Sequence, residues 1–218
     1  MAWYEGHLVR DADDLIAVDA AIDLSICGRS LARDRATRLA AQGAHDPTPT
    51  PYWVLRELFA QVELDDSSSL LDVGCGAGRV LAYLLRAGFM GSTTGVELDA
   101  EYARIAQGWT SGHKRLRFVQ GNALDQDLGA FSHFYLFNPF DPEVLDAFIR
   151  HVEEQVPRPV TVMHMSDNGN TIQYLGRPGW SKLSSGRIQD YVDPCGERIP
   201  FYDCPQHYTI WRFAPQRG

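Results

Sequence analysis

Five short apolar runs lie between residues 69 and 165, and they alternate with segments that have helical spacing. Such spacing joins Val80, Leu81, Leu84 and Leu85 after the first run. Short buried strands that alternate with helices are typical of a parallel sheet with helices on both faces and right-handed crossovers. We therefore expect a doubly wound α/β fold. The five runs read SLLDV, TTGVEL, LRFVQ, FSHFYLF and PVTVMHM.

The pattern changes after Met165, where two further apolar runs follow without a clear helix between them. These runs are WSKLSSGRIQDYV and HYTIWRF. Such a pair predicts two antiparallel strands at the edge of the sheet, which then has seven mostly parallel strands. Between the fourth and fifth runs, Asp141 and Pro142 are the expected cap and first residue of another helix.

The pattern of the first 63 residues predicts a helical extension. Helical spacing runs from about Asp11 to Ala41, and the proline-rich segment HDPTPTP ends it. Thr50 can cap a second helix in which Pro51 is the first residue. We therefore expect a helical extension or lid at residues 1–63 and an α/β domain at residues 64–218.

Composition limits the partners of the chain. Its 218 residues, 44% of them hydrophobic, suffice for one well-buried core. A net charge of −8 gives no overall positive field for nucleic acid, so a small molecule or a protein is the expected substrate. The N-terminal residues lack the pattern of a signal peptide, and no apolar run is long enough to cross a membrane. We expect a cytoplasmic protein.

The four cysteines form no CxxC pair, and we expect them to be reduced thiols. Cys195, Cys204 and His207 do not have the tight paired spacing of a zinc site. The sequence therefore predicts no metal.

Three glycines at alternate positions follow the first apolar run, in LLDVGCGAGRVL. They are Gly74, Gly76 and Gly78. Glycines at a strand-to-helix turn permit positive φ and let a cofactor lie against the main chain. A dinucleotide fingerprint requires glycine at position 79, which is Arg79, and the chain contains no P-loop.

The motif D-x-G-x-G-x-G, from Asp72 to Gly78, resembles motif I of the class I S-adenosylmethionine-dependent methyltransferases. The resemblance implies that S-adenosylmethionine is the cofactor. An acid such as Asp72 suits the amine of its methionine part, and backbone amides of the turn suit its carboxylate. The expected contacts in the turn are Gly74, Cys75, Gly76 and Gly78.

Two further stretches point to adenosine. Glu97 and Leu98 are the last residues of the second apolar run, and an acid at the position of Glu97 accepts hydrogen bonds from both ribose hydroxyls. NAD enzymes use an acid in the same way, so Glu97 by itself indicates adenosine only. Asn122 and Ala123 stand where family members contact adenine, although an asparagine after glycine is also a common turn residue.

Asn138, Pro139 and Phe140 follow the fourth run and resemble the fourth motif of nitrogen-modifying methyltransferases, with one proline missing. In the full motif, the amide oxygen and a main-chain carbonyl hold a planar NH₂ group, and the aromatic ring stacks on the substrate. The resemblance implies catalytic roles for these residues, with Asn138 also near the cofactor, and favours a nitrogen acceptor. The alternative is a strand exit that leads into a helix cap.

Several other polar residues have both a functional and a structural interpretation. His164 lies at the carboxyl end of the fifth run and is a candidate general base or a buried histidine. Tyr52 and Thr50 could reach over the cofactor, or Tyr52 could belong to the core. Four arginines could bind an acidic substrate or form a solvated helix face, which Asp34 interrupts. They are Arg29, Arg33, Arg35 and Arg38.

The motifs together predict an S-adenosylmethionine-dependent methyltransferase. Two alternatives stay open. One is an enzyme for NAD or a nucleotide sugar with a degenerate glycine loop, which Arg79 argues against. The other is a catalytically silent protein that binds S-adenosylmethionine as a partner subunit.

Overall fold

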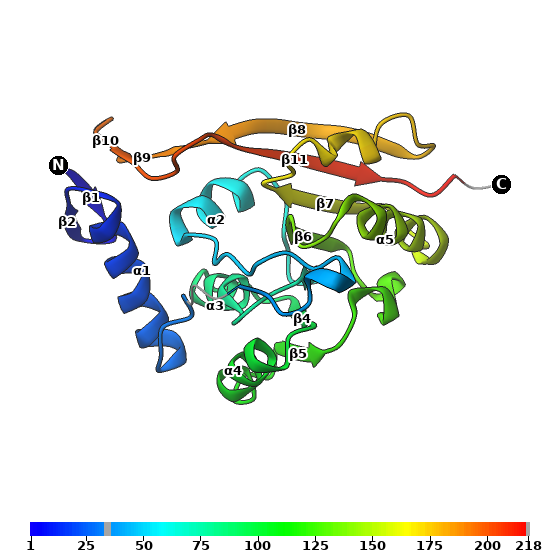
Figure 1. Ribbon diagram of the computed structural model, residues 1–218, viewed down its shortest axis with the longest axis horizontal. Helices are drawn as coiled ribbons and strands as arrows, with labels where there is room; N and C mark the ends of the chain where they lie inside the picture. The colour runs from blue at the N-terminus through cyan, green and yellow to red at the C-terminus, as the bar shows by residue number, and fades with distance from the viewer. Residues whose placement is uncertain (33–35, 217–218) are drawn as a thin grey trace.

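The computed structural model describes residues 1–32 and 36–216. Its centre is a seven-stranded sheet with the strand order β5-β4-β3-β6-β7-β11-β8 (Figure 1). Strands β3 to β7 pair in parallel, while β11 runs antiparallel to both β7 and β8. The predicted fold class is therefore confirmed, including its antiparallel edge. The strands are β3 Ser69–Val73, β4 Ser92–Glu97, β5 Leu116–Gln120, β6 His133–Phe137, β7 Val160–Met165, β8 Trp180–Ile188 and β11 Gln206–Phe213.

Helices pack on both faces of the sheet, because the central strands are apolar on both sides. Tyr135 of β6 belongs to the core on the face of α3 (Arg79–Arg86), together with α1 and α2. Its neighbours Phe134 and Leu136 point the other way, into the core with α5 (Pro142–Gln155). The remaining crossover helix is α4 (Ala100–Thr110).

The N-terminal segment differs from the sequence prediction. Helix α1 spans Ala12–Cys27 and does not continue to Ala41. Gly28 ends it in the left-handed conformation with a φ of 69°, and its N–H donates to the Leu24 carbonyl. Among the described residues between Gly28 and helix α2 (Tyr52–Phe59), the one helical element is a 3₁₀ turn, η1 (Ala40–Gln42). Exposed Arg29 and Arg38 therefore lie on no common helix face.

The part of the predicted helix that contains Arg33, Asp34 and Arg35 lies outside the described residues.

Of the two predicted helix caps, that at Thr50 is wrong, whereas Asp141 is confirmed as the cap residue of α5 and Pro142 as its first residue. Pro51 occupies the cap position of α2, and the Thr50 hydroxyl bonds with the Tyr135 hydroxyl at 2.8 Å. Asp141 precedes α5 as expected, but its side chain caps no backbone N–H of that helix. Its carboxylate instead contacts His45, which makes this aspartate part of the site described below.

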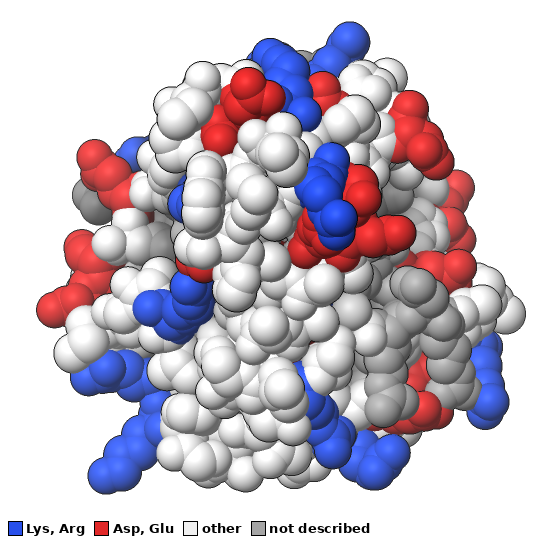
Figure 2. Space-filling model, turned by 90° about the vertical axis from the view of Figure 1, so that its left-hand side faces the viewer, with Lys and Arg blue, Asp and Glu red and all other residues white. Residues whose placement is uncertain are grey.

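Two small antiparallel hairpins were not predicted. Strands β1 (Ala2–Tyr4) and β2 (His7–Val9) precede α1, and β9 (Asp190–Val192) pairs with β10 (Arg198–Pro200). Basic and acidic side chains are interspersed on the face that carries the N-terminal elements, around a large uncharged area (Figure 2). Within the described part of the chain, no helix has the length and apolar character needed to cross a membrane.

Candidate functional site

The glycine turn after β3 packs tightly against the exit of β6. Gly74 has a φ of 69°, and a Cβ atom built on it would lie 2.8 Å from Cβ of Pro139. Gly76 and Gly78 also have positive φ, and a Cβ on Gly78 would lie 3.0 Å from the Trp109 ring. A side chain at position 74 would separate the two strand ends, so the predicted need for glycine is real there.

Two adjoining cavities lie over the carboxyl ends of the strands, where ligands of open α/β sheets bind. Each has a void of several hundred Å³, about 460 and 840 Å³ including the part open to solvent. The first is lined by Asp72, Gly74, Cys75, Gly76 and Arg79. The second is lined by Glu97, Leu98, Asn122, Ala123 and Phe140, among others. Both share Pro47, Thr48, Gly74 and Phe137, so they form one elongated site.

Asp72 lies at one end of this site and is almost fully buried, with 2% of its surface exposed. Its Oδ2 atom has no hydrogen-bond partner among the described residues. Burial, reinforced by the negative charge of Glu97, raises the pKa of the Asp72 carboxyl well above its ordinary value. A buried carboxyl without a donor is costly, and it suits a ligand that brings a cationic donor.

Glu97 lines the second cavity and already accepts hydrogen bonds from backbone amides. Its carboxylate accepts the N–H of Gly76 at 2.7 Å and that of Asp99 at 2.8 Å. Burial raises the pKa of Glu97, while these amide bonds oppose the rise. The neighbouring Asp99 is the cap of α4, and its side chain accepts the N–H groups of Glu101 and Tyr102.

A segment that the sequence prediction treated as a helix end forms the roof of the site. We call residues 37–50 the strap. In Figure 1 it runs between α1 and α2, in the blue to cyan part of the chain. Strap residues line both cavities, including Leu39, His45, Pro47 and Thr48. The prolines of HDPTPTP were the available signal, because they favour an extended segment with a fixed course.

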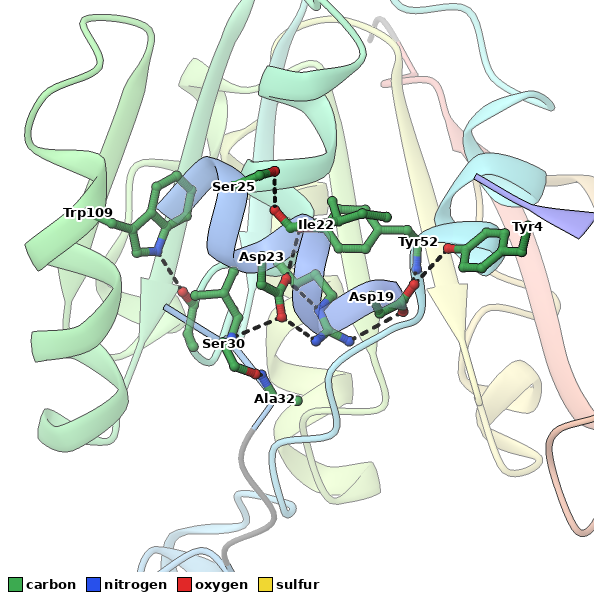
Figure 3. A network of polar contacts seen from close by, with 12 residues as sticks. Tyr4, Asp19, Ile22, Asp23, Ser25, Ser30, Ala32, Tyr52 and Trp109 are labelled. Atoms are coloured by element: carbon green, nitrogen blue, oxygen red, sulfur yellow. Dashed lines mark hydrogen bonds and ion pairs between the residues drawn. The ribbon is translucent and has the colours of Figure 1, made fainter. Parts of the chain in front are cut away.

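Arg79 lines the first cavity from the start of α3 and belongs to a buried polar network (Figure 3). Its guanidinium donates to both oxygens of Asp23, at 3.2 and 2.6 Å, and lies 3.7 Å from Asp19. Tyr4 and Tyr52 donate their hydroxyls to Asp19 and Asp23, respectively. Burial raises the pKa of Asp19 to about 6. The network joins α1 to the helix that follows the glycine turn.

Asn138 follows β6 with a left-handed φ of 40°, and its acceptors are engaged. Its side-chain Oδ1 accepts a hydrogen bond from Asn170, and its main-chain carbonyl contacts the His45 ring at 2.7 Å. The Pro139 carbonyl accepts the His45 N–H. Pro139 and Phe140 line the second cavity, and Phe140 packs against Phe148.

The remaining predicted residues lie elsewhere or act locally. Tyr52 is 2% exposed in the network with Asp23, and it does not line the two cavities. His164 is buried beside Tyr174 and likewise outside them. Burial lowers the pKa of His164 to about 4, so its imidazole is neutral. Asn122 caps the turn at residues 123–125, and Gly78 packs on Trp109 and not on a cavity.

Comparison with known proteins shows that the central region of the chain is similar to methyltransferases. A family described as a methyltransferase domain matches residues 70–157. Two trans-aconitate 2-methyltransferases of Rhodopseudomonas palustris, from strains BisB18 and BisA53, are 36% identical over 67 residues. That match covers 31% of this chain, and it spans only 25% of the length of each relative.

Solved structures show the fold over most of the chain. An RNA methyltransferase from Salinibacter ruber in complex with S-adenosyl-L-homocysteine has a TM-score of 0.52 at 20% identity, covering 79% of this chain and 95% of its own. A precorrin-6y C5,15-methyltransferase from Geobacter metallireducens has a TM-score of 0.57 at 13% identity, over 74% and 87%. A structure from work on thioacetal formation during echinomycin biosynthesis reaches 0.58 at 14% identity, over 92% and 94%. The chain has the class I methyltransferase fold.

Proposed function

We propose that the protein is an S-adenosylmethionine-dependent methyltransferase. The unpartnered Oδ2 of buried Asp72 carries the proposal, because it lies in a cavity where the ammonium of the cofactor would supply the missing donor. Glu97 lines the adjoining cavity and can accept ribose hydroxyls. The family match over residues 70–157 supports this reading.

Different residues of the chain would bind different parts of the cofactor. Asp72 and the amides of the glycine turn would hold the methionine part, and Glu97 with Leu98 would hold the ribose. Asn122, Ala123 and Phe140 line the part suited to adenine. Bound S-adenosylmethionine supplies a sulfonium with a transferable methyl group. The acidic lining suits that positive charge, since Asp23 and Asp19 neutralise Arg79.

The preference for a nitrogen acceptor stays a prediction. A planar NH₂ group would have to share the amide oxygen of Asn138 and the neighbouring main-chain carbonyls, which each already have one partner in Asn170 or His45. We therefore propose an acceptor search that is not restricted to amines. The panel should include trans-aconitate, which appears in the names of the two bacterial relatives, together with hydroxyl compounds and protein substrates.

A catalytically silent binding subunit is the second candidate, because the cofactor contacts do not require a working acceptor site. Cofactor binding without turnover over a broad acceptor panel would favour it. An NAD enzyme would instead bind NAD at the same Glu97.

Ligand binding provides the first test. S-adenosylhomocysteine at about a hundred times its dissociation constant should stabilise the fold by roughly 2.7 kcal/mol, since it binds only the folded state. The measurement is the shift in melting temperature, with NAD as the matched ligand control. Stabilisation by NAD and none by S-adenosylhomocysteine or S-adenosylmethionine would refute the proposed cofactor.

Glu97 provides the second test. Glu97→Gln should weaken S-adenosylhomocysteine binding by about tenfold or more, because a charge-assisted hydrogen bond to the ribose is worth about 1.5–3 kcal/mol. Calorimetry measures the affinity, and Glu143→Gln, an exposed acid on α5, is the control for the change of charge. Equal affinity in a folded variant would limit Glu97 to holding the amides of Gly76 and Asp99.

A further inference from the structure

The strap is attached to the exit of β6 by a compact set of hydrogen bonds around His45. The His45 ring contacts the Asn138 carbonyl through Nδ1 at 2.7 Å and the Asp141 carboxylate through Nε2 at 2.9 Å. The His45 N–H donates to the Pro139 carbonyl at 3.1 Å, and the Asp141 N–H donates to the Gly43 carbonyl at 2.9 Å. These bonds join segments more than 90 residues apart in the sequence, since His45 and Asn138 are 93 residues apart.

Both ring nitrogens of His45 lie within hydrogen-bond distance of an oxygen atom, the Asn138 carbonyl on one side and the Asp141 carboxylate on the other. The ring therefore joins the strap to two residues in the segment that follows β6. The second cavity, which lies beside these contacts, is lined by three acidic residues. They are Asp46 on the strap, Glu97 at the end of β4 and Asp99 at the start of α4.

The His45 contacts lie beside the parts of the strap that cover the cofactor site. Pro47 and Thr48 line both cavities, and a Cβ on Gly76 would lie 3.7 Å from Cβ of Pro47. The roof over the glycine turn is thus only a few residues from His45. A cofactor that fills the site between strap and strand ends must leave past this roof.

We infer that His45 is a positioning residue that fastens the strap over the cofactor site and thereby sets how long the cofactor stays bound. The inference rests on the proposed function for the identity of the ligand. The fastening itself does not, because it is made by residues of the chain alone. Its two parts can therefore be tested separately.

Dissociation of S-adenosylhomocysteine tests the effect on the ligand. His45→Ala should raise the dissociation rate about tenfold or more, because it removes the two ring contacts, to the Asn138 carbonyl and the Asp141 carboxylate, that hold the roof. The association rate should change by less than about threefold, as changes at one site act mainly on dissociation. His45→Gln should restore part of the residence time, because its amide can still donate to the Asn138 carbonyl. Stopped-flow displacement measures both rates, with exposed His7→Ala as the control.

Limited proteolysis tests the fastening without any ligand. Arg38 is exposed on the strap, so trypsin should cut after it faster in His45→Ala than in the wild type. Mass spectrometry identifies the cut. Asp141→Ala should have a smaller effect in the same direction, because it removes the contact with Nε2 and leaves the one between Nδ1 and the Asn138 carbonyl. The double variant should be cut no faster than His45→Ala, because that change already removes the contact with Asp141.

Unchanged dissociation together with unchanged cleavage at Arg38, in a folded His45→Ala protein, would overturn the inference. A lower melting temperature with no change in residence time would also overturn it, since His45 would then act only on stability. Faster cleavage in the variant, with no binding of S-adenosylhomocysteine by the wild type, would support the fastening and refute the proposed cofactor.

Discussion

Arg79→Met should lower the free energy of unfolding by about 3–5 kcal/mol, because it leaves buried carboxylates without their counter-ion. Asp23 is fully buried and Asp19 is 5% exposed by side chain, and Arg79 is the cation that faces both. Burial opposes the charge of Arg79, while its bonds to Asp23 and its closeness to Asp19 outweigh this and raise its pKa. Methionine keeps much of the volume but none of the donors.

Urea unfolding of the ligand-free protein measures this loss, and the melting temperature should fall by about 2–4 °C for each kcal/mol. Arg86→Met is the matched control, since Arg86 lies on the same helix but is 42% exposed in its pair with Glu5. Its effect should stay within about 1 kcal/mol. Adding Asp23→Asn to Arg79→Met should recover part of the loss. A variant of Arg79 as stable as that of Arg86 would show that the network contributes little.

The central sheet could be predicted from the sequence because its strands are apolar on both faces. The runs SLLDV and FSHFYLF contain β3 and β6, and their pairing in parallel follows from the helices between them. The segment after Gly28 could not be predicted in the same way. Its Leu31 N–H donates to the buried Asp23 carboxylate, and this tertiary contact replaces a helical one. Helical spacing alone carries no information about such a partner.

That Asp72 and Glu97 lie at the same edge of the sheet could be predicted, because both stand near the carboxyl ends of strands. Asp72 is the second-last residue of β3 and Glu97 is the last residue of β4, and these two strands pair in parallel. The roof was not predictable, because His45 finds its partners 93 and 96 residues away. The same contacts occupy the Asn138 and Pro139 carbonyls, which a motif comparison cannot reveal. Arg79 entered the prediction only as an absent glycine, although it is the centre of a buried network.

Asp72→Asn should separate stability from binding, because the wild-type carboxyl is costly without a ligand. Burial and the charge of Glu97 raise the pKa of Asp72 in the folded state above its unfolded value of about 3.9. A raised carboxyl pKa means that the folded state binds more protons, so this group costs stability increasingly as the pH rises from about 4 toward its folded pKa. The amide cannot ionise and does not incur that cost.

We therefore expect the ligand-free Asp72→Asn protein to be about 1 kcal/mol more stable than the wild type at pH 8, with a smaller difference at pH 5. Its affinity for S-adenosylmethionine should fall about 10- to 100-fold, because the ammonium loses a charged acceptor. Thermal unfolding at the two pH values and calorimetry measure the two effects, with exposed Asp66→Asn as the control. If the variant binds as tightly as the wild type, Asp72 does not hold the ammonium. A variant that is less stable without ligand would mean that the carboxyl has a partner within the fold. We expect the substitution to raise the stability of the ligand-free protein and to lower its affinity for the cofactor. This combination is typical of a residue that contributes to binding and destabilises the ligand-free fold.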